Sequence, residues 1–583
     1  MSTSTRENYS VPQEAWEVLQ RGILENPLLG NIPTELKSLT KNLHFEGSDK
    51  PSIPINWRFA ESITALKGLE ALMLNLLITR KYNSQPVDVT INTDHAALFI
   101  LSPVVAQIIK DGKPVPLLSY SEKPADVDRL FPDEDKHRAG PSPHRGRATN
   151  IYETKDGRFY HCHGGMNPEP TLTALGLPLE GEPDDTMADP DGTALNRFKT
   201  AASKFDANTL DEVINEKYRQ AGTICYTSEE YFNTPHGQAN SKVGLYEIFK
   251  HEKSSQPASW WKDDASYPSS AKRPLAGLKV VDLARVIASP AITRALAEMG
   301  ASVMRVTSPQ VTDFSLFHHD LNWGKWNCHL HLKNEEDKEK LRELIRDADV
   351  VVDGYRPGVM ERLGFGREAI FELVKDRGYG IIHVQENCYG WYGPWSHRSG
   401  WQQISDACCG VSMGYGKALG HNEPVTPIFP NSDYCTGVCG SIAVLQALMD
   451  RAEKGGSYAV DVALNYYSQW LVKSCGEYPK GVWEEVWGRH GNHSYRHYEP
   501  MMISLPATIG LLLQVDREIL FQPKFFEARR AENLGETFAV VKPIAQFKDN
   551  AVELKYNVGT RGNGTDKAVW PKDLTVQVVT GEN

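Results

Sequence analysis

Residues 278–385 alternate short apolar stretches with amphipathic helical ones, and this order constrains the fold more than any other feature of the chain. Between the first two apolar stretches a helical pattern runs from Ser289, which suits a helix start, to Gly300, which suits a helix end. Four stretches have the length and composition of buried strands: 278–283, 302–306, 348–353 and 379–385. This rhythm predicts an α/β fold with a parallel, Rossmann-like sheet in the C-terminal half of the chain.

The turn after the first predicted strand, residues 284–289, reads Ala-Arg-Val-Ile-Ala-Ser. It lacks the glycines of a dinucleotide fingerprint, so we expect neither NAD nor FAD. His161 and His163 are close in sequence but have no carboxylate beside them, which is weak for a metal site. The nine cysteines form no paired CxxC knuckles. We therefore expect no metal and no permanently bound cofactor.

The composition excludes several classes of partner. The chain has 583 residues, 40% of them hydrophobic and 23% charged, as in soluble globular proteins. Its formal net charge of -11 argues against non-specific binding to nucleic acid or to anionic membranes. No apolar run reaches the roughly 18 residues of a membrane span. The N-terminus has no apolar signal region, and the cysteines read as free thiols, so we expect a cytoplasmic protein.

The chain reads as two globular parts, residues 1–252 and residues 275–583. Residues 253–274, between them, are rich in Ser, Pro and Lys and lack hydrophobic periodicity, which indicates a linker. A polar segment at 121–149 is expected to be an exposed loop within the first part.

The two parts share a motif order. Two segments each contain a helix ending in a basic residue, a polar turn, a Val-Asp-Val strand and a second helix: residues 76–104 and 447–475. Arg80 aligns with Arg451. Asp88 aligns with Asp461 after two extra residues in the second segment. Agreement in motif order as well as in pattern favours a divergent, partial tandem copy in the N-terminal half.

Five segments of the second part together resemble a known family. They occur in the order PLAGLKVVDLARVIASPAITRALAEMGASVMRV, NWGKW, ADVVVDGYRPGVMERLGFG, SDYCTG and VDVAL. In this order the chain is similar to the family III CoA-transferases of the CaiB/BaiF type, a group that includes formyl-CoA transferases and α-methylacyl-CoA racemases. The resemblance covers residues 274–475 closely, and YRPGVMERLGFG is its most specific segment.

The resemblance implies that Asp433, in the NSDYCTG segment, is a nucleophile. Its carboxylate would attack an acyl-CoA thioester and carry coenzyme A as an aspartyl thioester to a small carboxylic acid, with no need for ATP or metal. The acyl-CoA would then be a substrate rather than a bound cofactor. Without the resemblance, an aspartate before an apolar helical run is more simply a helix cap, and both roles can coexist.

The resemblance also carries contacts to coenzyme A over by position. Val286, Ile287 and Ala288 would line the thiol arm. Tyr355 and Arg362 would lie near the nucleotide. Arg305 and Arg356 are candidate partners of the phosphates, because guanidinium groups match phosphate oxygens.

Two other functions stay open. The related racemases use a histidine base in a Gly-His-Asp segment, where this chain has Gly400-Trp401-Gln402, and tryptophan cannot accept a proton. A shift of register could bring in His397 instead. We expect Trp401 and Gln402 to line the substrate pocket, as an aromatic residue does in the transferases. A third reading is a non-catalytic CoA-binding homologue.

The first part carries Ser62 where the second carries the nucleophile, and Ser62 has no evident activating base. We therefore expect this part to supply packing surface rather than a second active centre. The partners implied are an acyl-CoA and a small carboxylic acid, with no nucleic acid and no membrane. The family's interlocked dimers imply either a homodimer or an internal pseudo-dimer.

Overall fold

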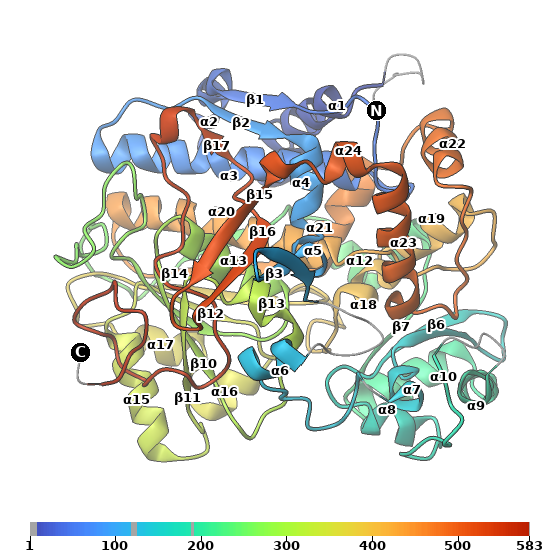
Figure 1. The fold of residues 1–583 in the computed structure, drawn as a ribbon. Helices are drawn as coiled ribbons and strands as arrows, with labels where there is room; N and C mark the ends of the chain where they lie inside the picture. Colours follow the sequence, from blue (N-terminus) through green and yellow to red (C-terminus); the bar gives the residue numbers. More distant parts are fainter. Residues whose placement is uncertain (1–8, 118–124, 141, 188–191, 582–583) are drawn as a thin grey trace.

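The computed structural model describes residues 9–117, 125–140, 142–187 and 192–581 (Figure 1). Its largest sheet has seven strands in the order β11-β10-β9-β12-β13-β14-β8. Their bounds are β11 Lys325–His329, β10 Ser302–Thr307, β9 Lys279–Leu283, β12 Val350–Asp353, β13 Ile382–Asn387, β14 Tyr458–Ala463 and β8 Glu247–Lys250. Neighbouring strands are parallel except for β14 and β8, which are antiparallel. The predicted α/β fold with a parallel sheet is confirmed.

Strand β9 lies between β10 and β12 in the sheet. The chain therefore extends the sheet first on the β10 side of β9 and then on the β12 side. Such a switch point leaves a crevice at the carboxyl ends of the two strands. Helix α13 (Ala288–Glu298) begins there, one residue before the predicted start, so Ser289 lies inside its first turn. The predicted helix end is confirmed, since Gly300 follows the helix with a φ of +114° that favours glycine.

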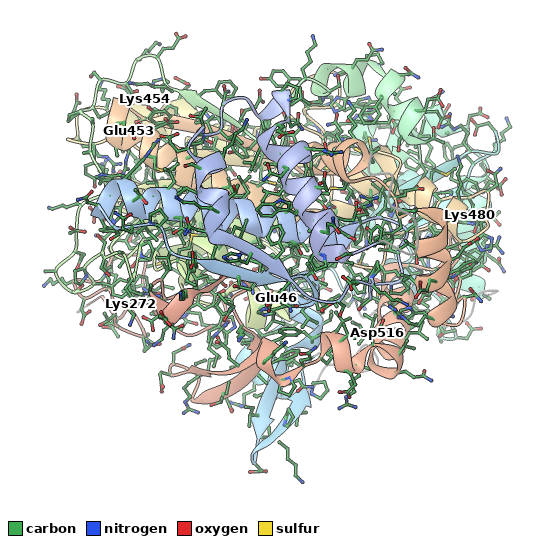
Figure 2. All side chains as sticks on the ribbon, turned by 90° about the horizontal axis from the view of Figure 1, so that it is seen from above. Glu46, Lys272, Glu453, Lys454, Lys480 and Asp516 are labelled. Carbon is green, nitrogen blue, oxygen red and sulfur yellow. The ribbon has the colours of Figure 1, made fainter. Side chains whose placement is uncertain are left out.

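Two long helices form the centre of the molecule. Helices α3 (Phe59–Tyr82) and α20 (Asn431–Lys454) each have 24 residues and pack side by side. Ser441 of α20 donates a hydrogen bond to Glu70 of α3, and Arg80 pairs with Glu453 at 2.8 Å. These contacts advance in the same direction along both helices, so the helices are parallel. Glu453, near the end of α20, lies at the edge of the molecule (Figure 2).

Among the described residues, α3 is the one helix long and apolar enough to cross a membrane by length and composition. Inside this structure, 94% of its apolar window is buried. Much of that surface faces α20 and the short helix α4 (Thr93–Phe99), so the apolar character of α3 serves packing of the core.

The two parts of the sequence share one hydrophobic core, so the division at 253–274 does not separate two packing units. Strand β8 of the first part adds to the sheet of the second part beside β14. The predicted linker has no helix or strand, but Trp261 within it is buried and donates to the carbonyl of Ala276 at 3.0 Å. Lys81 of α3 lies 4.1 Å from the centre of the Trp261 ring, which holds the linker against the core.

A smaller lobe of the first part has its own core, at the lower right of Figure 1. It contains the antiparallel strands β5 (Asn150–Glu153), β6 (Phe159–His163) and β7 (Ala221–Ile224). Two helices cover this sheet, α9 (Thr193–Ala202) and α10 (Ala207–Glu212). The lobe reaches the main sheet through residues that also line the candidate active site.

Candidate active site

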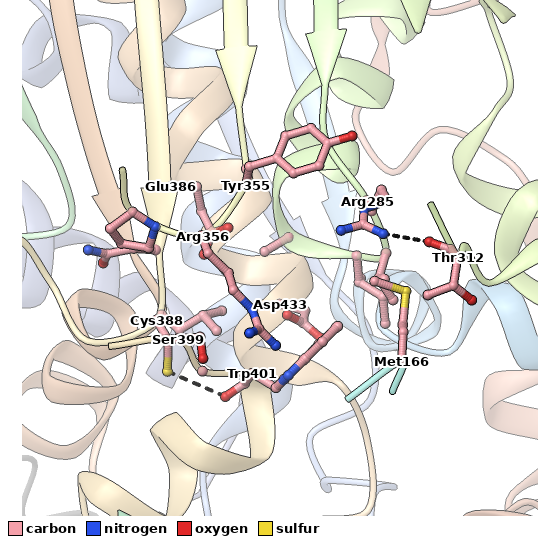
Figure 3. A pocket seen from close by; sticks show the side chains of 18 of the residues that line it. Met166, Arg285, Thr312, Tyr355, Arg356, Glu386, Cys388, Ser399, Trp401 and Asp433 are labelled. Atoms are coloured by element: carbon pink, nitrogen blue, oxygen red, sulfur yellow. Dashed lines mark hydrogen bonds between the residues drawn. The ribbon is translucent and has the colours of Figure 1, made fainter. Parts of the chain in front are cut away.

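A cavity of about 340 Å³ opens at the switch point of the main sheet (Figure 3). Its walls come from the turns that follow β9, β12 and β13 and from the first turn of α20. The carboxyl ends of parallel strands meet at this edge, which is where open α/β sheets bind ligands.

Asp433 is the third residue of α20, and its carboxyl group faces the cavity (Figure 3). The cap position belongs to Pro430, so the alternative reading of Asp433 as the helix cap is wrong. Within the described residues, this carboxyl has no hydrogen-bond partner. Burial, and then the nearby charges of Glu386 and Asp406, raise the pKa of Asp433 well above its ordinary value. The first turn of a helix partly offsets this effect, because it favours a negative charge.

The turn after β9 supplies Val286, Ile287 and Ala288, and all three line the cavity, while their contact with the thiol arm stays a prediction. Val286 has a φ of +75°, a conformation in which a β-branched residue is an outlier. Such strain persists only where the surrounding structure imposes it, and it is concentrated at functional sites. The strained turn leads directly into α13, which packs against α20 behind Asp433.

Two arginines give the cavity positive charge. Arg356, in the turn after β12, donates to the carbonyl of Arg219 at 3.0 Å and to Gln220 Oε1 at 3.2 Å. Arg285 lies over the ring of Tyr355, with its guanidinium carbon 5.1 Å from the ring centre. Burial and the charge of Arg285 lower the pKa of Arg356. No carboxylate among the described residues forms an ion pair with either arginine, so the cavity suits an anionic ligand.

The structure corrects one predicted contact and leaves another outside the cavity. Arg305 is buried on β10, where it pairs with Asp313 at 2.7 Å and donates to Asn563 at 2.9 Å. Arg305 does not line the cavity and its donors are engaged by these partners, so the structure contradicts the prediction that it is a phosphate partner. Arg362 is exposed on α16 (Val359–Leu363) and does not line the cavity, so its contact with the nucleotide stays a prediction.

Trp401 lines the cavity and stacks on His163 of the smaller lobe, with ring centres 5.0 Å apart and planes at 6°. Gly165 makes room for it, since a Cβ there would lie 3.2 Å from the Trp401 ring. The prediction for Gln402 is wrong. This side chain is buried behind the cavity and donates to Asp406, which also accepts from Ser432 at 3.3 Å.

The first part of the chain contributes directly to the cavity wall, which sequence reasoning missed. His137, Met166 and Asn167 all line it. The segment 121–149, predicted to be an exposed loop, contains helices α6 (Ala125–Leu130) and α7 (Pro143–Gly146). Positions 121–124 and 141 of that segment lie outside the described residues.

Two residues considered for other functions, the possible racemase base His397 and Ser62 of the first part, do not line the cavity. His397 is exposed and bonds Glu216 at 3.0 Å, so it cannot act as the racemase base on a ligand beside Asp433. Ser62 is buried and bonded to the carbonyl of Phe59 and to the Tyr467 hydroxyl, both at 2.9 Å. In the part of the chain that the structure describes, no group of three or more His, Cys, Asp or Glu side chains could hold a metal ion.

The parallel sheet, the Asp433 carboxyl and two arginines that have no carboxylate partner among the described residues are typical of an α/β enzyme that acts on an anionic ligand. Residues 275–499 match the model of the family described as CoA-transferase family III. The chain is 60% identical over 574 residues to the acetyl-coenzyme A transferase nodX of Hypoxylon pulicicidum, covering 98% of this chain and 96% of that protein. It is 34% identical over 544 residues to an acyl-CoA transferase of Gibberella moniliformis, with 90% of both chains covered. The chain therefore belongs to CoA-transferase family III and is a CoA-transferase.

Solved structures match a smaller share of the chain. A CAIB/BAIF family protein from Brucella suis is 26% identical, with a TM-score of 0.30, and the match covers 34% of this chain and 55% of that one.

Proposed function

We propose that this CoA-transferase moves coenzyme A from an acyl-CoA donor to a carboxylic acid acceptor through a covalent intermediate on Asp433. The observation that carries the proposal is the Asp433 carboxyl, which faces the cavity from the first turn of α20 without a hydrogen-bond partner among the described residues. A carboxylate left free in this way can serve as a nucleophile. The helix amides around it favour negative charge as it develops.

The steps balance without an outside reagent. An Asp433 oxygen attacks the thioester carbon, the C–S bond breaks, and coenzyme A leaves as a thiolate from a mixed anhydride. The thiolate then attacks the Asp433 carbonyl carbon, which releases the donor acid as a carboxylate and leaves an aspartyl-CoA thioester. The acceptor carboxylate repeats these steps in reverse order, so each bond broken is replaced by one of similar energy.

The charge of the cavity supports an acid as the second substrate. Among the described residues that line the cavity, Arg285 and Arg356 are the cationic groups without a carboxylate partner, and either can hold a carboxylate or a phosphate oxygen. We propose acetyl-CoA as the donor because the relative with 60% identity is named an acetyl-coenzyme A transferase.

An exchange assay with Asp433→Asn tests the proposal. The amide keeps the size of the side chain but cannot form the anhydride, so we expect loss of acyl exchange with unchanged folding. Glu368→Gln is the matched control, since Glu368 is exposed on α17 (Arg367–Leu373) and does not line the cavity. Full exchange by folded Asp433→Asn would reject Asp433 as the nucleophile.

We also propose that residues 1–252 and 275–583 descend from one unit and form an internal pseudo-dimer. The supporting observation is that α3 and α20 are equal in length and parallel, and each leads into a strand and a short helix. When Arg80 is aligned with Arg451, Glu70 falls on Ser441, its hydrogen-bond partner. Contact between equivalent positions is what a two-fold axis produces. Light scattering should give the mass of one chain, 65.2 kDa, and twice that mass would count against it.

We propose a reducing compartment, the cytoplasm, as the place of action, with no nucleic acid or membrane as partner. The support is that all nine cysteines are unpaired and buried. Cell fractionation tests this, and recovery of the protein from an oxidising compartment would reject it.

A further inference from the structure

The cavity holds a second carboxyl group that the steps above do not use. Glu386, at the end of β13, lines the same cavity as Asp433, and Figure 3 shows both groups on its wall. Its side chain is only partly covered by protein, so it is accessible to a ligand in the cavity.

Three chain segments meet at Glu386: β13, which carries it, the first turn of α13 and the turn after β12. Ser289, in the first turn of α13, donates to Glu386 Oε2 at 2.9 Å. Gly354, after β12, makes this approach feasible, because a Cβ there would lie 2.2 Å from Ser289 Oγ. Among the described residues no cation pairs with Glu386, so its charge is not balanced as a structural ion pair would be.

Two carboxyl groups that line one cavity do not both ionise readily, since each negative charge disfavours the other. Asp433 has the first turn of a long helix to stabilise its charge, whereas Glu386 has one hydroxyl. Burial raises the pKa of Glu386 to about 7, and burial together with the charges of Glu386 and Asp406 also raises the pKa of Asp433, so one carboxyl group of the pair keeps a proton. The titratable and charged groups around the two are Asp353, Asp406, Cys388, Tyr355, His137, Arg285, Arg356 and Arg398.

We propose that Glu386 is a second catalytic residue, a neutral carboxylic acid that donates a hydrogen bond to the oxyanion formed when Asp433 attacks the thioester. This inference rests on the proposed nucleophile. As the Asp433 oxygen bonds to the carbonyl carbon, the C=O electron pair moves onto the carbonyl oxygen, which accepts the Glu386 hydrogen bond. When the C=O bond re-forms, the C–S bond breaks and the thiolate leaves with its electron pair. The proton stays on Glu386 throughout.

Two variants and one control test the role of Glu386 in acyl exchange. Glu386→Ala removes the donor, and we expect kcat to fall about 100-fold, as for loss of one oxyanion donor. Glu386→Gln keeps a neutral donor of the same size, and we expect kcat within about tenfold of wild type. Glu368→Gln should behave as wild type. An Ala variant with the wild-type kcat would overturn the proposal.

The pH profile separates a proton donor from a packing residue. If the acid form of Glu386 is required, kcat of the wild type declines as pH rises through the titration of Glu386, and Glu386→Gln lacks that decline. The Gln variant supplies this test even if Glu386→Ala does not fold. A decline that persists in Glu386→Gln would reject the role.

Adduct formation tells the two proposals apart. Mass spectrometry of the wild type incubated with acetyl-CoA reports on Asp433 alone. An Asp433 adduct together with unaffected Glu386 variants would reject only the acid. Absence of the adduct while exchange proceeds would reject the nucleophile itself, and with it the role of Glu386.

Discussion

Ser441 on α20 donates a hydrogen bond to Glu70 on α3, and the other oxygen of Glu70 pairs with the buried ammonium of Lys67. This small network joins the two parts of the sequence inside the shared core. Breaking a buried ion pair costs about 3–5 kcal/mol, because one charge loses its partner, whereas losing a hydroxyl donor costs about 1 kcal/mol.

We therefore expect Glu70→Ala to lower the free energy of unfolding by about 3–5 kcal/mol and Ser441→Ala by about 1 kcal/mol. Urea denaturation of both variants measures this. The double variant Lys67→Met/Glu70→Leu removes both charges, so it should recover most of the loss. Equal destabilisation by all three would contradict a buried ion pair.

Asp406 predicts a pH dependence of stability. Burial raises the pKa of Asp406 to about 7, so the folded state holds this proton more tightly than the unfolded chain does. The stabilisation of the folded state by this proton is fully present below about pH 4 and is lost as pH rises through 7. From pH 5 to pH 8, Asp406→Asn should gain roughly 2 kcal/mol in unfolding free energy relative to wild type. A difference that does not change with pH would contradict this.

The strained turn at Val286 predicts that the usual order of stability of Gly and Ala variants is inverted there. At an ordinary position glycine is less stable than alanine by about 0.5–1 kcal/mol. A Cβ at positive φ costs about 1–2 kcal/mol, so at Val286 the Gly variant should be the more stable of the two. Val359, in α16, is the control position, where the Ala variant should be more stable. The usual order at Val286 would mean that the turn is not strained.

Trp401 predicts a change in specificity rather than in chemistry. It forms cavity wall and stacks on His163 but has no group that transfers a proton. Trp401→Ala should shift kcat/KM toward bulkier acyl-CoAs by about tenfold or more, since pocket shape sets such ratios. Trp401→Phe should keep the original preference. Complete loss of exchange in folded Trp401→Ala would show that the residue is needed for the reaction itself.

Much of the main sheet was predictable because its strands are continuous apolar runs. Strand β11 was missed because it contains Lys325, whose buried ammonium pairs with Asp282 and donates to the carbonyl of Pro290, both at 2.9 Å. Strand β8 was missed because it is a short strand at the sheet edge with Phe249 exposed. Both depend on partners distant in sequence.

The residues of the candidate site also divide into those that the sequence predicted and those that it did not. Asp433 and the turn after β9 were found because their motifs lie within single segments. Arg305 was assigned wrongly because Asp313, which engages it, is brought near by a loop. Glu386 follows the predicted strand 379–385 and belongs to no motif, and only the fold brings it to the cavity that Asp433 faces.

The most direct test of the account is intact-protein mass spectrometry after incubation with acetyl-CoA and no acceptor acid. We predict a mass increase that maps to the Asp433 peptide in the wild type and is absent in Asp433→Asn. A wild type that exchanges acyl groups but forms no adduct at Asp433 would contradict it.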